Sequence, residues 1–507
     1  MSAAPEARCT ARRVAVIGGG LAGITAAIAL AEAGAAVTLL EARPRLGGAT
    51  CSFARDGLIV DTGQHIYLGC CTAYRGLLDK LGMTAHAPLQ ARFDVTVLAP
   101  GSRSGRLRRT ALPGPLHMLP ALARYRFLSL AERASVARPA LAMRFTNPAA
   151  PRVDEQRFGD WLAARGQSDR ARRALWDLFT VSALNIAGDD ASLSLAATVV
   201  KTGLLGKNNA ADIGVPALPL GELHGDAGAT LLTKLGAQVL LNAKVAAIEP
   251  ADSPDSRFLV RLARGGDDAA VPAEIPADAV VLAVPHEAAA RLMPPGALPD
   301  ATVAGWAGLG ASPIVNVHVI YDRPVTELPF AAAVDSPVQW VFDRTRISGL
   351  DRNSPGKAQY LAISLSAADE YVEVPAAELR ERFVPALAQL FPAARGAQVT
   401  EFFVTRERRA TFRQAPGTAR LRPGPGTELP GLVLAGAWTD TGWPDTMESA
   451  VRSGLAAAIE LRRTALSAPG HPDSALSAPG HPRAGYSGSV VSGSEGNSST
   501  STIGVRQ

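Results

Sequence analysis

Three glycines near the amino terminus have the spacing of a phosphate-binding loop. Gly18, Gly20 and Gly23 form the pattern G-x-G-x-x-G directly after the apolar run Val14–Ile17. Glycine at these positions permits a tight turn, close approach of the backbone to a pyrophosphate and close packing of a helix on a strand. Amides at the start of the next helix attract phosphate. Glu41 follows at the end of a second strand, where a carboxylate can accept hydrogen bonds from the ribose hydroxyls. The pattern predicts a dinucleotide-binding strand–helix–strand unit.

A second pair of glycines follows this acid. Ala42, Arg43 and Arg45 lead into Gly47 and Gly48. Two glycines at this distance allow the backbone to wrap the pyrophosphate again, and an arginine neutralises phosphate charge. The alternatives are an ordinary turn here, and a transmembrane helix over 14–40. Three consecutive glycines disfavour that helix.

Two further segments carry polar groups that suit a planar ring. In Asp61–Gly69, the triplet Gly63, Gln64 and His65 offers hydrogen bonds, and a histidine can donate a proton near neutral pH. A purely structural histidine is the alternative. The run 435–450 leads from a strand into a helix, and its residues 443–446 set amides and a tryptophan beside a ligand. The alternative there is a capping turn with a packed tryptophan.

Strand signals far apart in the sequence indicate one nucleotide domain made of separate segments. They are the N-terminal unit, 245–248 with 278–285, and 432–436 leading into a helix near 447–462. A helical stretch (about 80–231) and a β-rich stretch (about 313–405) with alternating apolar residues lie between them. We therefore expect an α/β fold, a discontinuous Rossmann-type domain with an inserted α+β substrate domain. The expected boundaries are 1–80, 232–295 and 425–463 for the nucleotide domain, 81–231 and 296–424 for the substrate domain, and 464–507 for a disordered low-complexity tail.

Composition excludes several classes of protein. An apolar content of 47% with 19% charged residues fits a globular chain with a large core, and a net charge of +5 in 507 residues makes no case for nucleic acid. Four cysteines form neither a disulfide framework nor a metal-ligand pattern. We interpret them as small buried side chains in a reducing cytoplasm, with a redox dithiol at Cys70–Cys71 as the alternative.

The motifs together resemble the flavin amine oxidase and phytoene desaturase superfamily. The resemblance lies in E-A-R-x-x-x-G-G from Glu41, D-x-G-Q-H from Asp61 and A-G-x-W-T-x-T-G-W-P-x-T-M-E from Ala435, and it covers about residues 13–463. Within the superfamily, GQHIYLGCCTAY and TGWPDTMESAVRSG are most similar to the squalene-associated FAD-dependent desaturases, the hydroxysqualene dehydroxylases. Two departures from the common pattern, Ala49 for arginine and Ala437 for an acid, leave FAD contacts to be replaced, the first by Arg43 or Arg45.

The resemblance implies FAD as the cofactor and assigns residues to it. Gly18, Gly20, Gly23 and Glu41 would hold the adenosine end, and Val245 would touch the adenine through its backbone. Segment 42–48 would contribute Ala42, Arg43, Arg45 and Gly48 near the pyrophosphate. The flavin side would be lined by Gly63, Gln64 and His65, and the ring and ribityl chain would be covered by the C-terminal motif: Gly436, Gly442, Trp443, Pro444, Thr446 and Met447.

The implied reaction is reductive removal of the hydroxyl of hydroxysqualene to give squalene, in squalene and hopanoid biosynthesis. Hydroxide leaves only when protonated, and His65, Asp440 and Asp445 are the candidate acids by motif position. A phytoene-type carotenoid desaturase is the alternative enzyme. A lipid-binding protein with structural or absent flavin is the alternative of another class. The reductant, NADPH or a redox partner, stays open.

A lipid substrate also suggests a membrane surface as a partner. Arg103, Arg106, Arg108 and Arg109 precede a proline-broken apolar segment and the run 121–130. Basic residues beside such a segment favour contact with anionic lipid, whereas the alternative is a solvated loop with a core helix. We expect a cytoplasmic protein that is peripherally associated with the inner face of the membrane.

Overall fold

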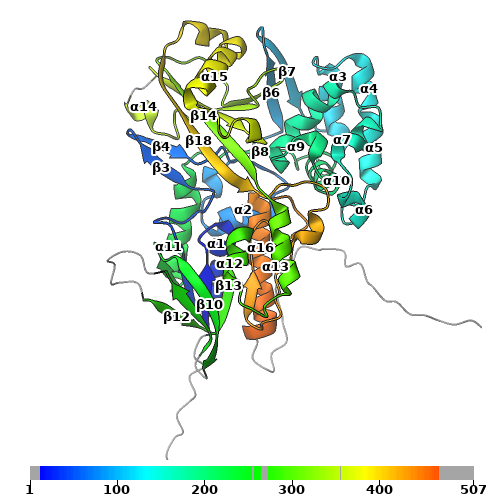
Figure 1. The fold of residues 1–507 in the computed structure, drawn as a ribbon. Helices are drawn as coiled ribbons and strands as arrows, with labels where there is room; N and C mark the ends of the chain where they lie inside the picture. The colour runs from blue at the N-terminus through cyan, green and yellow to red at the C-terminus, as the bar shows by residue number, and fades with distance from the viewer. Residues whose placement is uncertain (1–11, 254–255, 264–271, 354–355, 467–507) are drawn as a thin grey trace, which may run out of the picture. The chain divides into compact units, whose positions relative to one another are not determined.

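The computed structural model describes residues 12–253, 256–263, 272–353 and 356–466 (Figure 1). The predicted low-complexity tail lies outside the described residues from 467 onward. The predicted domain boundaries stay a prediction. Among the residues that are described, no helix is long and apolar enough to cross a membrane.

A five-stranded parallel sheet carries the glycine motif. Its order is β19-β13-β1-β2-β9, with bounds Leu432–Leu434, Ala279–Leu282, Arg13–Ile17, Ala36–Leu40 and Gln238–Leu240. Four segments distant in sequence therefore pair: β1 aligns Val14 with Val37 of β2 and with Ala279 of β13. The predicted strands at 278–285 and 432–436 are confirmed, whereas 245–248 begins a strand of a different sheet, β10 (Val245–Ser253).

Alternate residues of β1 face two different layers. Val14 and Val16 pack with the helices α1 (Leu21–Glu32), α11 (Ala227–Lys234) and α16 (Met447–Leu461). Ala15 and Ile17 face the other layer, an antiparallel sheet of β10, β11 (Ser256–Leu262) and β12 (Glu274–Ala277). Burial on both faces explains why these strands are continuously apolar. Helix α2 (Thr72–Lys80) packs on α16.

A seven-stranded sheet forms the second large unit of structure. Its order is β18-β14-β17-β16-β15-β6-β7, and its bounds are Val399–Thr411, Ser312–Tyr321, Gln359–Leu365, Trp340–Asp343, Phe330–Ala333, Asp94–Ala99 and Arg103–Arg108. The alternating patterns correctly predicted β14 and β17. The stretch that was expected to be helical also contains the hairpin β6–β7. The sequence did not predict this hairpin, because β6 pairs with β15, a segment more than 200 residues away.

Both faces of β14 are buried, although its alternation predicted one buried face. Val315, Val317 and Val319 pack towards α15 (Ala376–Leu390). On the opposite face Asn316 and His318 are fully buried. The hairpin of β3 (Ser52–Arg55) and β4 (Leu58–Asp61) shares a core cluster with that face, so the polar alternation marks a covered face with buried polar groups.

A series of short helices follows β7 along the chain. They are α3 (Leu119–Arg124), α4 (Leu130–Ser135), α5 (Ala137–Phe145), α6 (Pro151–Asp154), α7 (Phe158–Ala163), α8 (Asp169–Ala171), α9 (Asp177–Leu184) and α10 (Leu193–Val199). The chain also contains β5 (Tyr67–Leu68), which pairs with β8 (Ile213–Gly214), and the helices α12 (His286–Leu292), α13 (Asp300–Gly305) and α14 (Leu350–Asn353). In Figure 1, α3, α4 and α5 lie together beside β6 and β7.

Candidate active site

The glycine loop between β1 and α1 forms a cradle open on one side. Gly18 has φ +108°, and a Cβ there would lie 2.3 Å from the carbonyl oxygen of Ala283. A Cβ on Gly23 would lie 1.8 Å from the carbonyl oxygen of Gly18. In contrast, a Cβ on Gly20 would meet nothing nearer than Gly48 Cα at 3.9 Å. The protein thus needs no glycine at 20 for its own packing, which fits a backbone kept bare for a pyrophosphate.

Glu41 closes this cradle from the end of β2. Its Oε2 accepts a hydrogen bond from the Gly19 amide at 2.7 Å, and its Oε1 accepts one from the Arg43 amide at 2.9 Å. The residue is buried. Each carboxylate oxygen can accept a second hydrogen bond, so Glu41 is positioned by the loop and keeps capacity for ribose hydroxyls.

The second glycine pair lies directly against the first loop. Gly47 donates its amide to the Gly19 carbonyl at 2.8 Å, and Gly48 has φ +59°, where a Cβ would lie 2.9 Å from Gly20 Cα. Of the two arginines, Arg43 is exposed and Arg45 is half-buried. The buried Nε of Arg45 has no hydrogen-bond partner among the described residues, as expected for a donor that awaits a phosphate.

Replacing Arg45 with methionine is expected to weaken FAD binding about ten-fold or more, because a charge-assisted hydrogen bond to phosphate is lost. Arg43→Met is the matched control, since the exposed side chain contributes little. Fluorescence titration of the apoprotein with FAD gives both affinities. Equal affinities for the two variants would remove Arg45 from the phosphate site.

The loop after β4 presents Gly63, Gln64 and His65 to a cavity. Nδ1 of His65 lies 3.2 Å from the Gly63 carbonyl oxygen. Burial lowers the pKa of His65, so its ring is neutral at neutral pH and is a weak proton donor there. Gln64 Oε1 and Asn316 Oδ1 are buried without partners in the part of the chain that the structure describes, which fits a ligand with donors at this position.

A buried ion pair fixes this loop from behind. Asp61, at the end of β4, pairs with Arg344, and both side chains are at most 8% exposed. Asp61 also accepts hydrogen bonds from Ser52 Oγ (2.6 Å) and the Leu220 amide (3.0 Å). The first residue of the D-x-G-Q-H motif therefore has a structural role, and the pair was not foreseen from sequence because Arg344 lies in an unrelated segment.

The C-terminal motif connects β19 to α16 around Gly436 (φ +138°) and Gly442 (φ +71°). After Pro444, Thr446 caps the helix by accepting from the Ser449 amide at 3.4 Å. The guanidinium of Arg452 lies 4.9 Å from the centre of the Trp443 ring.

Ala437 stands where many relatives have an acid. The buried Arg422 forms hydrogen bonds with the backbone at this position. It donates to the carbonyl oxygens of Ala437, Trp438 and Thr439 at 3.1, 3.2 and 2.6 Å. Burial lowers the pKa of Arg422. The sequence pattern did not single out this arginine, which positions the loop through its carbonyls.

Asp445 and Asp440 occupy different surroundings. Asp445 lines the cavity, and its Oδ2 accepts a hydrogen bond from the Phe412 amide at 2.9 Å. Burial raises the pKa of Asp445 to about 6, against the smaller opposing effects of that hydrogen bond and of Arg422. Asp440 is exposed, does not line the cavity, and accepts from the Gly442 amide at 3.2 Å. The structure therefore brings Asp445 and His65 to one cavity and leaves Asp440 outside it.

This cavity has a volume of about 300 Å³. It lies between the second glycine loop, the His65 loop, the start of α16 and the strands β14, β16, β17 and β18. Its apolar lining includes Ile66, Ile314, Trp340, Phe342 and Met447. Ala49 also faces it, so the first departure widens the cavity where an arginine would stand.

Two polar residues of the lining were missed by sequence reasoning. Asn185, in a left-handed conformation after α9, donates to the Ser312 carbonyl (3.0 Å) and to Thr411 Oγ1 (3.1 Å). Glu407 on β18 lines the cavity without an ion-pair partner in the described segments. Neither belongs to a recognisable motif, because their positions depend on the pairing of distant strands.

The parallel sheet carries a glycine-rich loop that is closed by Glu41, and an apolar cavity with the protonatable carboxyl group of Asp445 lies beside it. This combination is typical of a dinucleotide-dependent oxidoreductase. The chain belongs to the flavin-containing amine oxidoreductase family, whose model matches residues 21–461. The family establishes a flavin cofactor, usually FAD. The cradle fits that group, and so do Arg45 Nε and Gln64 Oε1, which are buried and have no hydrogen-bond partner among the residues that the structure describes.

Individual relatives agree with this assignment. The chain is 30% identical to a hydroxysqualene dehydroxylase of Rhodopseudomonas palustris over 88% of this chain and 97% of the relative. It is 28% identical to one from Sinorhizobium fredii over 88% and 97%. A zeta-carotene desaturase of Zea mays is 26% identical over 88% and 82%.

Solved structures confirm the predicted fold class. Putrescine oxidase bound to putrescine matches with a TM-score of 0.66 at 20% identity, over 89% of this chain and 99% of that chain. Cyclohexylamine oxidase from Brevibacterium oxydans matches with a TM-score of 0.61 at 20% identity, over the same shares. The fold is that of the flavin amine oxidases, and the enzyme is an FAD-dependent oxidoreductase.

Proposed function

We propose that this oxidoreductase removes the hydroxyl group of hydroxysqualene reductively to give squalene. The two relatives from Rhodopseudomonas palustris and Sinorhizobium fredii are named hydroxysqualene dehydroxylases. The match over 97% of the length of the Rhodopseudomonas palustris enzyme carries the proposal. The apolar cavity beside Asp445 supports it, since a C30 alcohol needs apolar walls and one acid.

The reaction balances as alcohol plus hydride plus one proton giving hydrocarbon and water. The hydride is the chemistry that reduced FAD would supply when bound. Asp445 holds the proton and delivers it to the leaving oxygen as the carbon–oxygen bond breaks. Ile66, Ile314 and Phe342 exclude water that would otherwise trap the allylic cation. In this proposal Gly63 and Gln64 would hold the flavin side, and Gly442–Met447 would cover the ring.

The adenosine end of FAD would lie on the cradle formed by Gly18, Gly20, Gly23 and Glu41, with the adenine beside Val245, which is 8% exposed at the start of β10. We also propose an external reductant, NADPH or a redox partner. Because the substrate dissolves in bilayers, the proposal includes peripheral attachment to the cytoplasmic face of a membrane.

The proposal is tested by reducing the purified flavoprotein anaerobically and adding hydroxysqualene in detergent. We expect the oxidised flavin spectrum to return, with squalene in the extract in a one-to-one ratio to flavin. A flavin that stays reduced with hydroxysqualene, while the oxidised enzyme bleaches with phytoene, would instead indicate a carotenoid desaturase. Protein that neither carries nor takes up flavin would indicate a lipid-binding role.

A further inference from the structure

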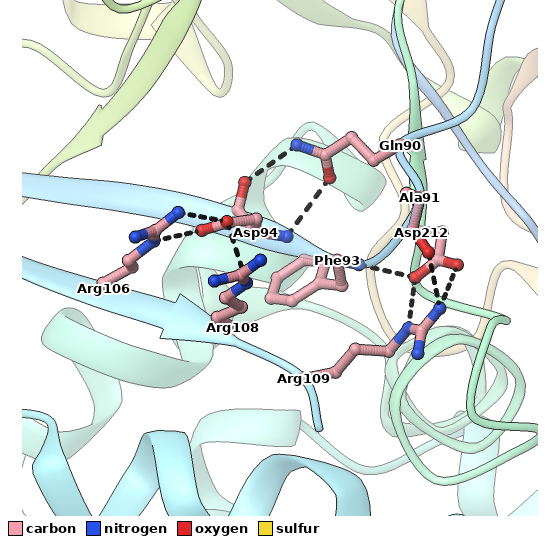
Figure 2. A network of polar contacts seen from close by, with 8 residues as sticks. All are labelled: Gln90, Ala91, Phe93, Asp94, Arg106, Arg108, Arg109 and Asp212. Carbon is pink, nitrogen blue, oxygen red and sulfur yellow. Dashed lines mark hydrogen bonds and ion pairs between the residues drawn. The ribbon is translucent and has the colours of Figure 1, made fainter. Parts of the chain in front are cut away.

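The four arginines expected at a membrane are all paired with carboxylates of the protein. Asp94 lies between Arg106 and Arg108, and Asp212 is bound to Arg109 (Figure 2). The Asp94 carboxylate is 2.6 Å from Arg106 and 3.3 Å from Arg108, and that of Asp212 is 2.6 Å from Arg109. Arg103 lies 3.7 Å from Asp335. The ion pair of Arg109 and Asp212 is largely buried. Asp212 also accepts a hydrogen bond from the Phe93 amide (Figure 2). These residues hold β6, β7 and the segment before β8 together and leave little free positive charge for lipid.

Exposed apolar side chains gather on a neighbouring segment. Eight large hydrophobic residues are exposed among the described residues, and six of them lie between 112 and 145. They are Leu112 (46%), Leu116 (47%), Leu119 (50%), Leu130 (79%), Leu141 (62%) and Phe145 (79%). Isolated exposed leucines are ordinary, but a concentration of this kind on one segment marks a contact surface.

The helices α4 and α5 arrange these side chains as a stripe. Val136, between them, has helical dihedral angles, so the two run on as one bent helix. Leu130, Ala134, Ala137, Leu141 and Phe145 are all exposed and follow the helical spacing of about 3.6 residues per turn. Val136, Pro139 and Met143, on the other side, are buried. The helix therefore presents apolar side chains outward as well as inward.

Unpaired positive charge surrounds this stripe. Residues 111–152 contain six arginines and one acid, Glu132, a difference of +5. Four of these arginines are exposed and have no ion-pair partner within the described segments: Arg124, Arg126, Arg138 and Arg144. On the helix, Arg138 and Arg144 flank the apolar stripe on its two sides. The Glu132 carboxylate accepts hydrogen bonds from the Ser129 amide and the Ser168 hydroxyl.

We propose that the exposed face of 112–145, here the α3–α5 face, docks on the surface of an anionic lipid bilayer. The outward leucines and phenylalanine match the acyl chains of a bilayer, and the flanking arginines, which have no ion-pair partner in the described part of the chain, match its anionic headgroups. A second copy of this chain would bring like charges together, which disfavours a dimer through this face.

The α3–α5 face adjoins a second cavity of about 350 Å³. Arg170 and Ala174 line this cavity and contact the segment after α3. Arg170 donates a hydrogen bond to the Phe127 carbonyl oxygen (2.8 Å), and the Tyr125 hydroxyl donates one to the Ala174 carbonyl oxygen (2.7 Å). Ser182 and Trp340 line both this cavity and the one beside Asp445. Docking here would bring the second cavity, which shares these two lining residues with the cavity beside Asp445, close to the membrane. For this purpose, though not for the surface itself, the inference rests on the proposed function.

The test is co-sedimentation of the holoenzyme with vesicles of phosphatidylcholine containing phosphatidylglycerol. Leu141→Gln/Phe145→Gln is expected to lower the partition coefficient about 100-fold, since burial of each side chain contributes about a factor of ten. The matched control is Ile459→Gln, a 42% exposed residue on α16, which is expected to bind like the wild type. Arg138→Gln/Arg144→Gln should lower binding about ten-fold, only on anionic vesicles. Arg103→Gln/Arg108→Gln removes the same charge from paired arginines and should change it little.

Wild-type protein that stays in the supernatant, or variants that sediment unchanged, would overturn the proposal. So would a dimer by sedimentation velocity that the Leu141→Gln/Phe145→Gln variant abolishes while vesicle binding stays absent. Flavin spectra confirm that each variant is folded. Turnover of hydroxysqualene in detergent separates the two proposals: it should be unchanged in these variants, and its absence in the wild type would refute the proposed function while leaving vesicle binding intact.

Discussion

Replacing Asp445 with asparagine is expected to lower reductive dehydroxylation by about 10²- to 10⁴-fold, the range lost with a general acid. The carboxyl group lines the apolar cavity, and burial raises its pKa to about 6. About a tenth of the Asp445 carboxyl groups are then protonated at pH 7, whereas for an ordinary aspartate the fraction is below about a thousandth. Asparagine keeps the hydrogen bond from the Phe412 amide, so the change removes the proton with little change in shape. Single-turnover reoxidation of the reduced flavin by hydroxysqualene measures the effect.

The dependence on pH follows from the same carboxyl group. The acid is active when protonated, so the rate should fall as pH rises above about 6. The Asp445→Asn variant should lack this limb. Asp440→Asn is the matched control, because Asp440 is exposed and does not line the cavity, and its rate should stay at the wild-type level. A wild-type profile in the Asp445→Asn variant would transfer the role to another group, His65 first.

Protein stability should show the same titration with a defined sign. The pKa of Asp445 is raised from 3.8 to about 6 in the folded state, so the folded state holds the proton more tightly than the unfolded state. Its contribution to stability is therefore full below about pH 4 and is lost as pH rises through about 6. Urea denaturation across this window should show a decline in the wild type that is smaller in Asp445→Asn.

The parts of the site that sequence could predict are those built from neighbouring residues. The loop Gly18–Gly23 and Glu41 belong to one strand–helix–strand unit, so their geometry follows from local rules, and the structure brings them together through the Gly19–Glu41 hydrogen bond. The same holds for the start of α16, where Thr446 caps the helix. Local chemistry and spacing suffice there, because few long-range contacts decide the conformation.

Other features depend on segments that meet only after folding. Asp445 was a candidate by its place in a motif, but its raised pKa comes from burial against β18, and its amide partner Phe412 is 33 residues away. Arg422, Asn185 and Glu407 carry no motif at all. The four arginines between 103 and 109 were expected to contact anionic lipid, whereas Asp94 and Asp212 pair with three of them in the fold. Partner identity is set by tertiary contacts that no periodicity encodes.

Replacing Gly20 with alanine is expected to separate FAD binding from folding. Gly20 has an extended backbone (φ −77°, ψ 179°) that any residue adopts, and an added Cβ would have no protein atom nearer than 3.9 Å. The apoprotein should therefore fold with unchanged stability. The methyl group would stand where the backbone approaches the pyrophosphate, and forcing a methyl into a close contact costs about 1–3 kcal/mol, a loss of about 10- to 100-fold in affinity. Titration of the apoprotein with FAD measures it.

Two matched glycines sharpen this result. Gly76→Ala places a Cβ in open space on α2 and should leave both FAD affinity and folding intact. Gly18→Ala forces a Cβ to 2.3 Å from the Ala283 carbonyl oxygen at positive φ, so it should lower the free energy of unfolding of the apoprotein itself. If Gly20→Ala behaves like Gly76→Ala, the pyrophosphate does not lie over Gly20. If it behaves like Gly18→Ala, position 20 serves folding rather than the cofactor. Only full stability with weakened FAD binding assigns the open side of the cradle to the pyrophosphate.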